Sequence, residues 1–319
     1  MTLIDPYQRT INYLRLSITD QCNLRCRYCQ PHGRAANRTR RLLRDREIMF
    51  LAQQAIDLGV EKIRITGGEP LVRSGVIRLL SELRALEGLQ HLVLTTNGLL
   101  LSRYAPDLAA AGVKRINVSI DSLRHERFRE ITRGGSLVEW CRGIDAAEKA
   151  GLTVKLNVVV MAGVNDDEVV DFVRFASQRD WTVRFIEYMP FAGDHYKAMD
   201  EQVLHERLDR AGFSLAPLPS GKVAGPAREY AVAGRAGKVG FISARSCPFC
   251  QQCNRLRVTA YGEGRGCLFS TEGINVRPAL EAFDCELLKD QLMQLASQKP
   301  QQYVSLDRGE QVVMSAIGG

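Results

Sequence analysis

The sequence predicts an α/β fold: a partial TIM-like (β/α)6 barrel over residues 1–215, followed by a small α+β domain over residues 216–319. Three observations lead to this prediction. Six short β-branched runs alternate with amphipathic segments, the alternation ends near residue 212, and a stretch rich in Gly, Pro and Ala follows. Repeated β-α units form parallel sheets with helical crossovers, so a barrel fits and an open doubly wound sheet is the alternative.

The predicted strands are short runs rich in Val, Ile and Thr. They cover residues 13–19, 62–68, 91–97, 115–121, 154–160 and 182–189. In the segments between them, apolar residues recur about every 3.6 residues, and several segments end at Gly, as helices often do. Helices are therefore predicted over residues 47–59, 76–88, 136–151 and 167–179.

The C-terminal part has a different pattern. Residues 216–246 are rich in turn-forming residues and predict short antiparallel strands. Residues 255–269 predict a hairpin, and residues 279–297 predict one helix.

The composition is typical of a globular protein in water. Of the 319 residues, 45% are hydrophobic and 25% charged, and no apolar run approaches the roughly 20 residues of a membrane span. The N-terminus lacks the layout of a signal peptide, so we expect a cytoplasmic protein with reduced thiols. Part of the net charge of +7 comes from residues 33–46. A solvated loop is favoured there over a nucleic-acid site.

Polar side chains recur on one face of the predicted strands, where a parallel sheet should be apolar. Because unpaired buried polar groups cost free energy, this pattern predicts a wet cavity with a polar ligand. The polar residues are expected toward the C-terminal strand ends, where barrels place active sites. Four cations of this set predict a ligand with several negative charges, such as a phosphate compound. The four are Lys62, Arg64, Lys155 and Arg184. The others are Arg15, Ser17, Thr66, Thr95, Asn97, Asn117, Ser119, Asp121 and Asn157.

Three of the nine cysteines lie within eight residues. Cys22, Cys26 and Cys29 form a C-x3-C-x2-C array. Three thiolates can hold a [4Fe–4S] cube whose fourth iron stays open to a small ligand. Structural zinc usually takes four protein ligands, so an array of three cysteines favours the cluster. A zinc site in which His32 supplies the fourth ligand is the alternative.

A second group of cysteines lies near the C-terminus. Cys250, Cys253 and Cys267 form a C-x2-C-x13-C array, and Cys247 lies three residues upstream. This spacing permits either an iron–sulfur cluster or a zinc site with four thiolates. Two cysteines stand alone and predict no metal role: Cys141 and Cys285.

The first array, with Tyr28 directly before its last cysteine, resembles the signature of the radical S-adenosylmethionine superfamily. Residues 66–70, TGGEP, resemble the superfamily motif that contacts the methionyl amino group. The resemblance implies a partial barrel, a [4Fe–4S] cluster on the three cysteines, and S-adenosylmethionine bound to its open iron. It assigns this cofactor to Tyr28, Gly68, Glu69, Ser119 and Met189.

The second array, the segment FIEYMPF and the terminal Gly318–Gly319 resemble the GTP 3′,8-cyclase family, which begins molybdenum cofactor biosynthesis. The resemblance implies a second [4Fe–4S] cluster on Cys250, Cys253 and Cys267, whose open iron meets the guanine of GTP. Cys247 is then either a spare thiol or a competitor for the fourth position. The resemblance places GTP at Arg15, Lys62, Arg64, Thr95, Lys155, Arg184, Arg255 and Arg257. Catalytic roles fall to Arg255, Arg257, Gly318 and Gly319.

The implied reaction is a radical cyclisation of GTP. A radical from S-adenosylmethionine removes the hydrogen at ribose C3′, and C3′ attacks C8 of guanine to give 3′,8-cyclo-7,8-dihydro-GTP. Implied partners are a one-electron donor such as flavodoxin or ferredoxin and a downstream pterin-forming enzyme. Both a monomer and a homodimer fit the sequence.

Three other functions fit parts of the sequence. A radical enzyme that modifies a peptide can share the barrel and carry extra C-terminal clusters. A radical enzyme acting on RNA fits the net charge and predicts steeply salt-dependent RNA binding. A zinc-stapled binding module fits the cysteines alone, and iron analysis separates it from the two-cluster enzyme.

Overall fold

The barrel wall is built from parallel strands in chain order. The structure is a computed structural model, and it describes residues 2–30, 40–189, 196–221, 225–270 and 272–303. All six predicted strands are present, with neighbours paired parallel from β1 to β6. They are β1 (Tyr13–Ser17), β2 (Lys62–Thr66), β3 (His91–Thr96), β4 (Arg115–Ser119), β5 (Thr153–Ala162) and β6 (Thr182–Glu187).

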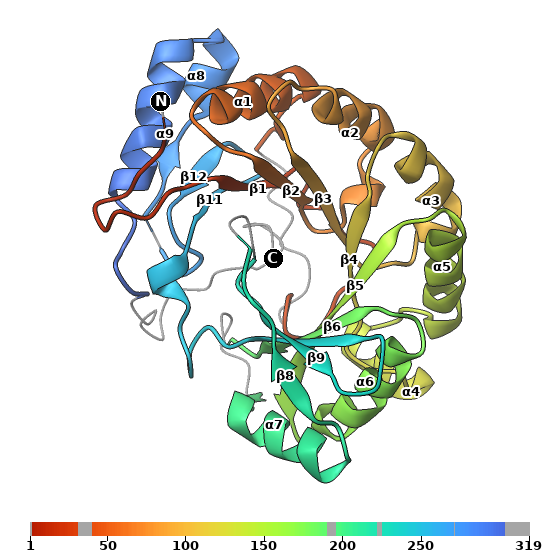
Figure 1. Cartoon of the computed structure of the whole chain (residues 1–319). Helices are drawn as coiled ribbons and strands as arrows, with labels where there is room; N and C mark the ends of the chain where they lie inside the picture. The colour runs from red at the N-terminus through yellow and green to blue at the C-terminus, as the bar shows by residue number, and fades with distance from the viewer. Residues whose placement is uncertain (1, 31–39, 190–195, 222–224, 271, 304–319) are drawn as a thin grey trace.

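Helices cover the outside of this wall (Figure 1). A doubly wound sheet would reverse its strand order partway, whereas here the order follows the chain, so the barrel prediction is confirmed. The four predicted helices are present and two further ones join them. They are α1 (Asp45–Asp57), α2 (Val76–Arg84), α3 (Leu101–Ala110), α4 (His125–Thr132), α5 (Leu137–Lys149) and α6 (Val169–Ser177).

The segment after residue 215 continues the same sheet at both of its ends. β10 (Lys238–Ile242) pairs parallel with β6, and β11 (Arg255–Val258) pairs parallel with β1. The predicted hairpin is confirmed, because β11 pairs antiparallel with β12 (Glu263–Arg265). The remaining elements are β7 (Lys197–Ala198), α7 (Glu201–Arg210), β8 (Leu215–Pro217), β9 (Arg228–Val232) and β13 (Ile274–Asn275).

The single helix predicted over residues 279–297 is wrong, because two helices occupy this segment. α8 (Arg277–Ala282) ends where Phe283 adopts a left-handed backbone with a φ of 54°. α9 (Cys285–Ser297) begins after Asp284, whose carboxylate accepts a hydrogen bond from Leu287 N at 3.0 Å. The left-handed residue and the new N-cap redirect the chain.

The apolar core lies between the strands and the helices around them. Leu14, Ile63 and Ile65 point to that side and are fully buried. The opposite strand parity is polar and also buried, as Arg15, with 9% exposure, and Arg64, with 6%, show. The barrel interior therefore carries charge, as the alternation of the sequence predicts.

The basic stretch before α1 is only partly described, since residues 31–39, including His32, lie outside the described ranges. Arg41 forms ion pairs with Glu47 of α1 at 3.0 Å and with Glu281 of α8 at 2.5 Å. Arg41 therefore pairs with one buried and one exposed carboxylate of the same chain. Across the described ranges, no helix is long and apolar enough to cross a membrane.

Candidate active site

Strand register stacks the inward side chains in layers. Arg257, Arg15 and Arg64 are direct partners across β11, β1 and β2. One step toward the strand starts, Arg255, Tyr13 and Lys62 form the next layer. A single-residue change of register would turn these cations into the apolar layer. The pairing of β11 with β1 therefore determines that Arg255 and Arg257 face the barrel interior.

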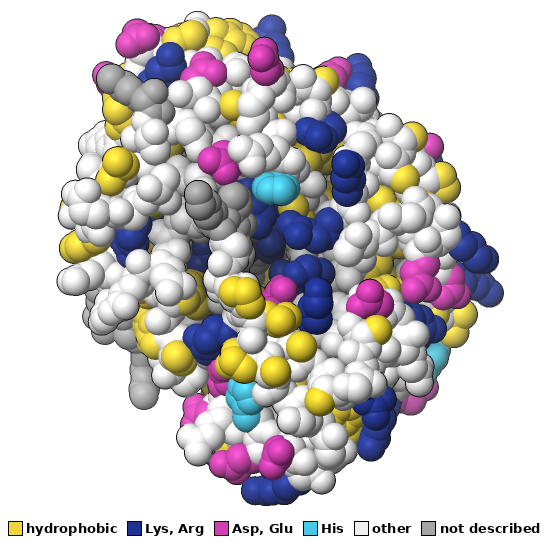
Figure 2. Space-filling view, in the orientation of Figure 1, with side chains coloured by type: hydrophobic (Ala, Val, Ile, Leu, Met, Phe, Trp, Pro, Cys, Tyr) yellow, Lys and Arg dark blue, Asp and Glu magenta, His cyan; other side chains and the backbone are white. Residues whose placement is uncertain are grey.

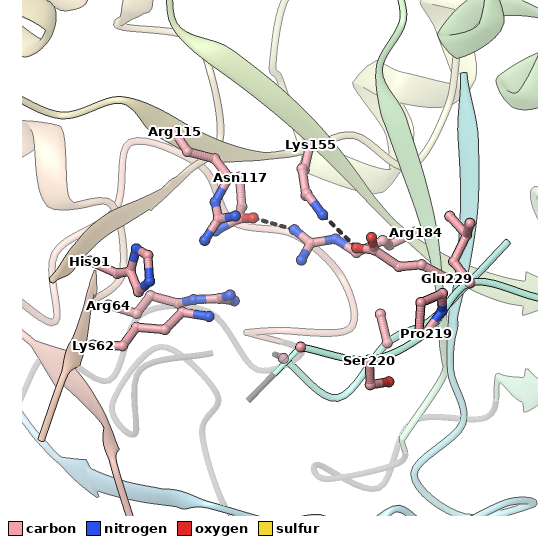
Figure 3. A pocket seen from close by; sticks show the side chains of 14 residues that line it. Lys62, Arg64, His91, Arg115, Asn117, Lys155, Arg184, Pro219, Ser220 and Glu229 are labelled. Atoms are coloured by element: carbon pink, nitrogen blue, oxygen red, sulfur yellow. Dashed lines mark hydrogen bonds and ion pairs between the residues drawn. The ribbon is translucent and has the colours of Figure 1, made fainter. Parts of the chain in front are cut away.

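The cations surround a cavity of 390 Å³. Figure 2, drawn in the orientation of Figure 1, shows Lys and Arg side chains gathered in a hollow near the centre of the molecule. In Figure 3 the side chains approach a common space from several strands. The basic residues that line it are Lys62, Arg64, His91, Arg115, Lys155 and Arg184.

This cationic cavity lies at the other end of the barrel from the one expected. Lys62, His91 and Arg115 are the first residues of β2, β3 and β4. The expectation that the cations lie toward the C-terminal strand ends is therefore wrong for this group. Inward residues of one parity run the full length of a strand, so parity alone does not say at which end a ligand binds.

Burial and mutual repulsion weaken the proton affinity of these cations. Burial, followed by the charges of Arg64 and Arg115, lowers the pKa of Lys62 to about 7. Burial and the charge of Arg64 lower the pKa of Arg184 to about 9. An anionic ligand would raise both pKa values again, because its negative charge favours the charged form of each side chain.

One carboxylate interrupts the positive charge. Glu229 of β9 accepts an ion-pair contact from the Lys155 ammonium, and Arg184 donates to Asn117 Oδ1 (Figure 3). Burial opposes ionisation of Glu229, but Lys155 and Arg184 outweigh it and lower the pKa of this carboxyl group. Glu229 therefore remains a negative group among the cations.

A second cavity, of 280 Å³, contains both cysteine triads in its lining. Arg64 lines this cavity and the cationic one, so the two adjoin at that side chain. The six lining cysteines are Cys22, Cys26, Cys29, Cys250, Cys253 and Cys267. All nine cysteines of the chain are free thiols.

The first triad follows β1 and lies at the C-terminal strand ends. Cys22 Sγ accepts hydrogen bonds from Leu24 N at 3.4 Å and from Asn97 Nδ2 at 3.8 Å. Burial, Cys29 and Asp121 raise the pKa of Cys26 well above its usual value. Thiolates packed this closely need a cationic partner, which an iron–sulfur cluster provides.

Tyr28 fastens this loop to the barrel. Its hydroxyl donates to Asp121 Oδ2 at 2.8 Å, and Asp121 Oδ1 accepts from Val159 N at 2.8 Å. Burial raises the pKa of Asp121 to about 6. The cysteine loop is thereby joined to the ends of β4 and β5.

Gly68 and Glu69 bring the end of β2 against the same loop. A Cβ on Gly68 would lie 2.4 Å from Gln21 O, so only glycine permits this approach. Glu69 N donates to Gln21 O at 2.7 Å, and the Glu69 carboxylate accepts from Asn97 N at 2.6 Å and Leu71 N at 3.1 Å. Gly68 lines the cavity, whereas Glu69 is fully buried behind it and supports the loops.

The second triad lies beside cations. Burial raises the pKa of Cys253, but Arg255 and Lys299 outweigh it and lower that pKa to about 6. The thiolate is the form that binds metal, so these cations favour ligation. Cys247 is exposed and does not line the cavity, which agrees with the spare thiol.

The donor sets fit iron–sulfur clusters and a polar ligand. Among the described residues, which do not include His32, no group of three His, Cys, Asp or Glu side chains lies close enough to hold a metal ion. Arg257 Nη1, Thr95 Oγ1 and Asn157 Oδ1 are buried and have no hydrogen-bond partner in the described ranges. Each such atom costs about 1–3 kcal/mol, so their gathering around the cavity fits a ligand that supplies the partners.

Most of the residues expected in the site do lie together. The cysteine cavity is also lined by Arg15, Tyr28, Arg64, Gly68, Thr95, Ser119, Met189, Arg255 and Arg257. The cationic cavity takes Lys62, Lys155 and Arg184. Gly318 and Gly319 lie outside the described residues.

The sequence reasoning missed three titratable residues that line the cationic cavity. Arg115 shares strand parity with Asn117 and Ser119, so this signal was available. His91 starts a predicted strand on the inward parity and was also detectable. Glu229 carried no comparable signal, because β9 reaches the cavity only through its pairing with β10.

Comparisons with known proteins account for both parts of the chain. Residues 16–176 match the Radical SAM superfamily, and residues 181–305 match Molybdenum Cofactor Synthesis C. The chain is 48% identical to the GTP 3′,8-cyclase of Geobacter sulfurreducens over the full length of both. It is 45% identical to the GTP 3′,8-cyclase of Heliobacterium modesticaldum, over 99% of this chain and all of the relative.

Solved structures share the fold at low identity. Streptococcus suis SuiB bound to S-adenosylmethionine has a TM-score of 0.61 at 15% identity, covering 94% of this chain and 78% of SuiB. SuiB bound to its precursor peptide SuiA has a TM-score of 0.64 at 15% identity, covering 90% and 67%. These likenesses confirm the architecture.

The barrel and its three-cysteine loop after β1 define a radical S-adenosylmethionine enzyme. Within that superfamily, the chain belongs to the GTP 3′,8-cyclase family, because the match to its members extends over both parts of the chain.

Proposed function

We propose that the enzyme converts GTP to 3′,8-cyclo-7,8-dihydro-GTP, the first step of molybdenum cofactor biosynthesis. Its cofactors are S-adenosylmethionine and two [4Fe–4S] clusters. One observation carries the proposal: both cysteine triads line one cavity, and Arg64 connects that cavity to the cationic one. A nucleotide can therefore reach both triads and the cations at once.

The first triad and its surroundings form the cofactor end. Cys22, Cys26 and Cys29 would hold the first cluster, and Tyr28, Gly68, Ser119 and Met189 would enclose S-adenosylmethionine. When bound, these groups supply the adenosyl radical that removes the hydrogen at ribose C3′. The residues' own task is to hold the nucleoside close to that radical and to keep water away.

The second triad and the cations form the two ends of the GTP site. Cys250, Cys253 and Cys267 would hold a cluster at the guanine end. Lys62, Arg64, Lys155 and Arg184 would bind the phosphates. Arg15, Thr95, Arg255 and Arg257 line the same cavity as both triads. They would contact the nucleoside, and Arg255 and Arg257 would act at its reacting atoms. Anchoring both ends fixes the distance from C3′ to C8, which favours ring closure over escape of the radical. Gly318 and Gly319 remain proposed catalytic residues.

The proposal includes partners that match this chemistry. An acidic one-electron carrier such as flavodoxin or ferredoxin would supply the electron, and the exposed Arg25 and Arg27 beside the first triad suit such a partner. A pterin-forming enzyme would consume the product. Nine free thiols suit a reducing compartment such as the cytoplasm.

The test is isotope transfer from the substrate. Anaerobically reconstituted enzyme receives a reductant, S-adenosylmethionine and GTP deuterated at C3′, and mass spectrometry follows the label. We expect deuterium in 5′-deoxyadenosine and a nucleotide product with the cyclised mass. GTP deuterated at C4′ is the matched control and should leave 5′-deoxyadenosine unlabelled. Label from C4′ alone would contradict the proposal.

A further inference from the structure

A buried lysine lies behind the second cysteine triad. Lys299 follows α9 and is only 3% exposed. Its Nζ donates to Gly266 O at 2.8 Å, to Arg255 O at 2.9 Å and to Cys253 Sγ at 3.5 Å. A lysine ammonium has three hydrogens, so these three acceptors use all of its donors.

The acceptors of Lys299 are the segments that carry two of the three cysteines. Arg255 lies two residues after Cys253, and Gly266 directly precedes Cys267. One ammonium therefore joins both segments and also contacts a ligand sulfur. A Cβ on Gly266 would lie 3.0 Å from Lys299 Cγ and 3.1 Å from Leu295 O, so this position is closely packed.

A second buried cation holds the third cysteine. Arg9 Nη1 donates to Cys250 O at 2.5 Å, and Arg9 Nη2 donates to Pro300 O at 2.8 Å. Arg9 itself is paired with the buried Asp5. The Cys250 segment is thereby joined to the residue that follows Lys299, so two buried cations hold all three cysteine segments in one arrangement.

We propose that Lys299 is a positioning residue of the second cluster, which fixes the Cys253 and Cys267 segments and raises the reduction potential of the cluster. The inference rests on the proposed function, because it requires a cluster on Cys250, Cys253 and Cys267. A fixed positive charge favours the reduced cluster, which carries one more electron. Hydrogen bonds to cluster sulfurs act in the same direction, because they withdraw charge from the iron.

The experiment isolates the second cluster. A parent variant with Cys22, Cys26 and Cys29 changed to Ser is reconstituted anaerobically, and iron is counted. About four irons per chain are expected. Electron paramagnetic resonance then follows a redox titration of the parent and of Lys299 variants. We expect Lys299→Met to move the midpoint to a more negative potential and Lys299→Arg to restore part of the shift.

Two further variants sharpen the result. Lys299→Gln keeps a hydrogen-bond donor without the charge and should fall between Met and the parent. Lys289→Met removes a positive charge from an earlier turn of α9 and should leave the midpoint unchanged. If Lys299→Met holds no iron, the Gln and Arg variants carry the test.

The outcomes separate this inference from the proposed function. A parent variant without iron at the second triad would refute the proposed function. A parent with about four irons, together with iron-replete Lys299→Met or Lys299→Gln at the parent's midpoint, would overturn the role of Lys299 alone.

Discussion

Lys155 of β5 donates to the carboxylate of Glu229 of β9, across the cavity proposed to take the phosphates of GTP. The two residues are distant in sequence and meet because β10 pairs with both β6 and β9. Glu229 thus holds one cation of the phosphate site and faces the space that an anionic ligand would enter.

Removing the carboxylate should strengthen GTP binding. Glu229→Gln ends the repulsion between Glu229 and phosphate and leaves Lys155 able to bind it. At about 1 kcal/mol for this effect, the dissociation constant of GTP should fall about fivefold. Anaerobic calorimetry measures the constant, with Glu206→Gln on the exposed face of α7 as control. Weaker binding in Glu229→Gln would show instead that the carboxylate is needed to orient Lys155.

Loss of a buried guanidinium should have the opposite effect. Arg184 is 4% exposed and donates to Asn117 Oδ1. Replacing it with Met removes a charge-assisted contact of about 1.5–3 kcal/mol and should weaken GTP binding about 10- to 100-fold. Binding of S-adenosylmethionine should not change. Arg174→Met, on the exposed part of α6, is the matched control, and equal losses for both ligands would point to misfolding.

GTP binding should weaken as the pH rises through neutrality. Burial and neighbouring cations lower the pKa of Lys62 to about 7, so the empty site loses this charge above that pH. Phosphate favours the charged form, so binding should take up a proton near pH 7 and above. Calorimetry in buffers of different ionisation enthalpy measures this uptake. Lys62→Met should abolish it, and an unchanged uptake in that variant would exclude Lys62 as its source.

The close approach of Gly68 to the first cysteine loop gives a structural test. In Gly68→Ala the new methyl group would lie 2.4 Å from Gln21 O, so the loop has to move. We expect weaker binding of S-adenosylmethionine and loss of up to about four irons per chain, with the second cluster retained. Gly221→Ala, where a Cβ meets no atom within 4 Å, is the control. Normal iron content and cofactor affinity would show that the loop tolerates displacement.

The sequence predicts the barrel because its local signals agree with the final packing. Strand parity alone identifies Arg15, Arg64 and Arg184 as site residues, since a charged residue on a buried strand needs a ligand or a partner. Parity did not give the end of the barrel at which the cations lie. That depends on the register, which places Lys62 beside Tyr13 and His91 at the strand starts.

Long-range pairing limits what the sequence can predict. Glu229 and Lys299 reach the site through the pairing of β10 with β6 and the packing of α9 on the β11–β12 hairpin, and no local pattern encodes either. The break at Phe283 was missed for a different reason. Apolar spacing continues from Leu280 to Leu288, because both positions are buried in the same core.

The central claim is that two clusters, each on three cysteines, face one cavity. Iron and sulfide analysis with Mössbauer spectroscopy of anaerobically reconstituted protein tests it directly. The account predicts about eight irons per chain, and about four in each variant in which one triad is changed to Ser. Colourless protein with tetrahedral zinc, or a chain that holds only one cluster, would contradict it.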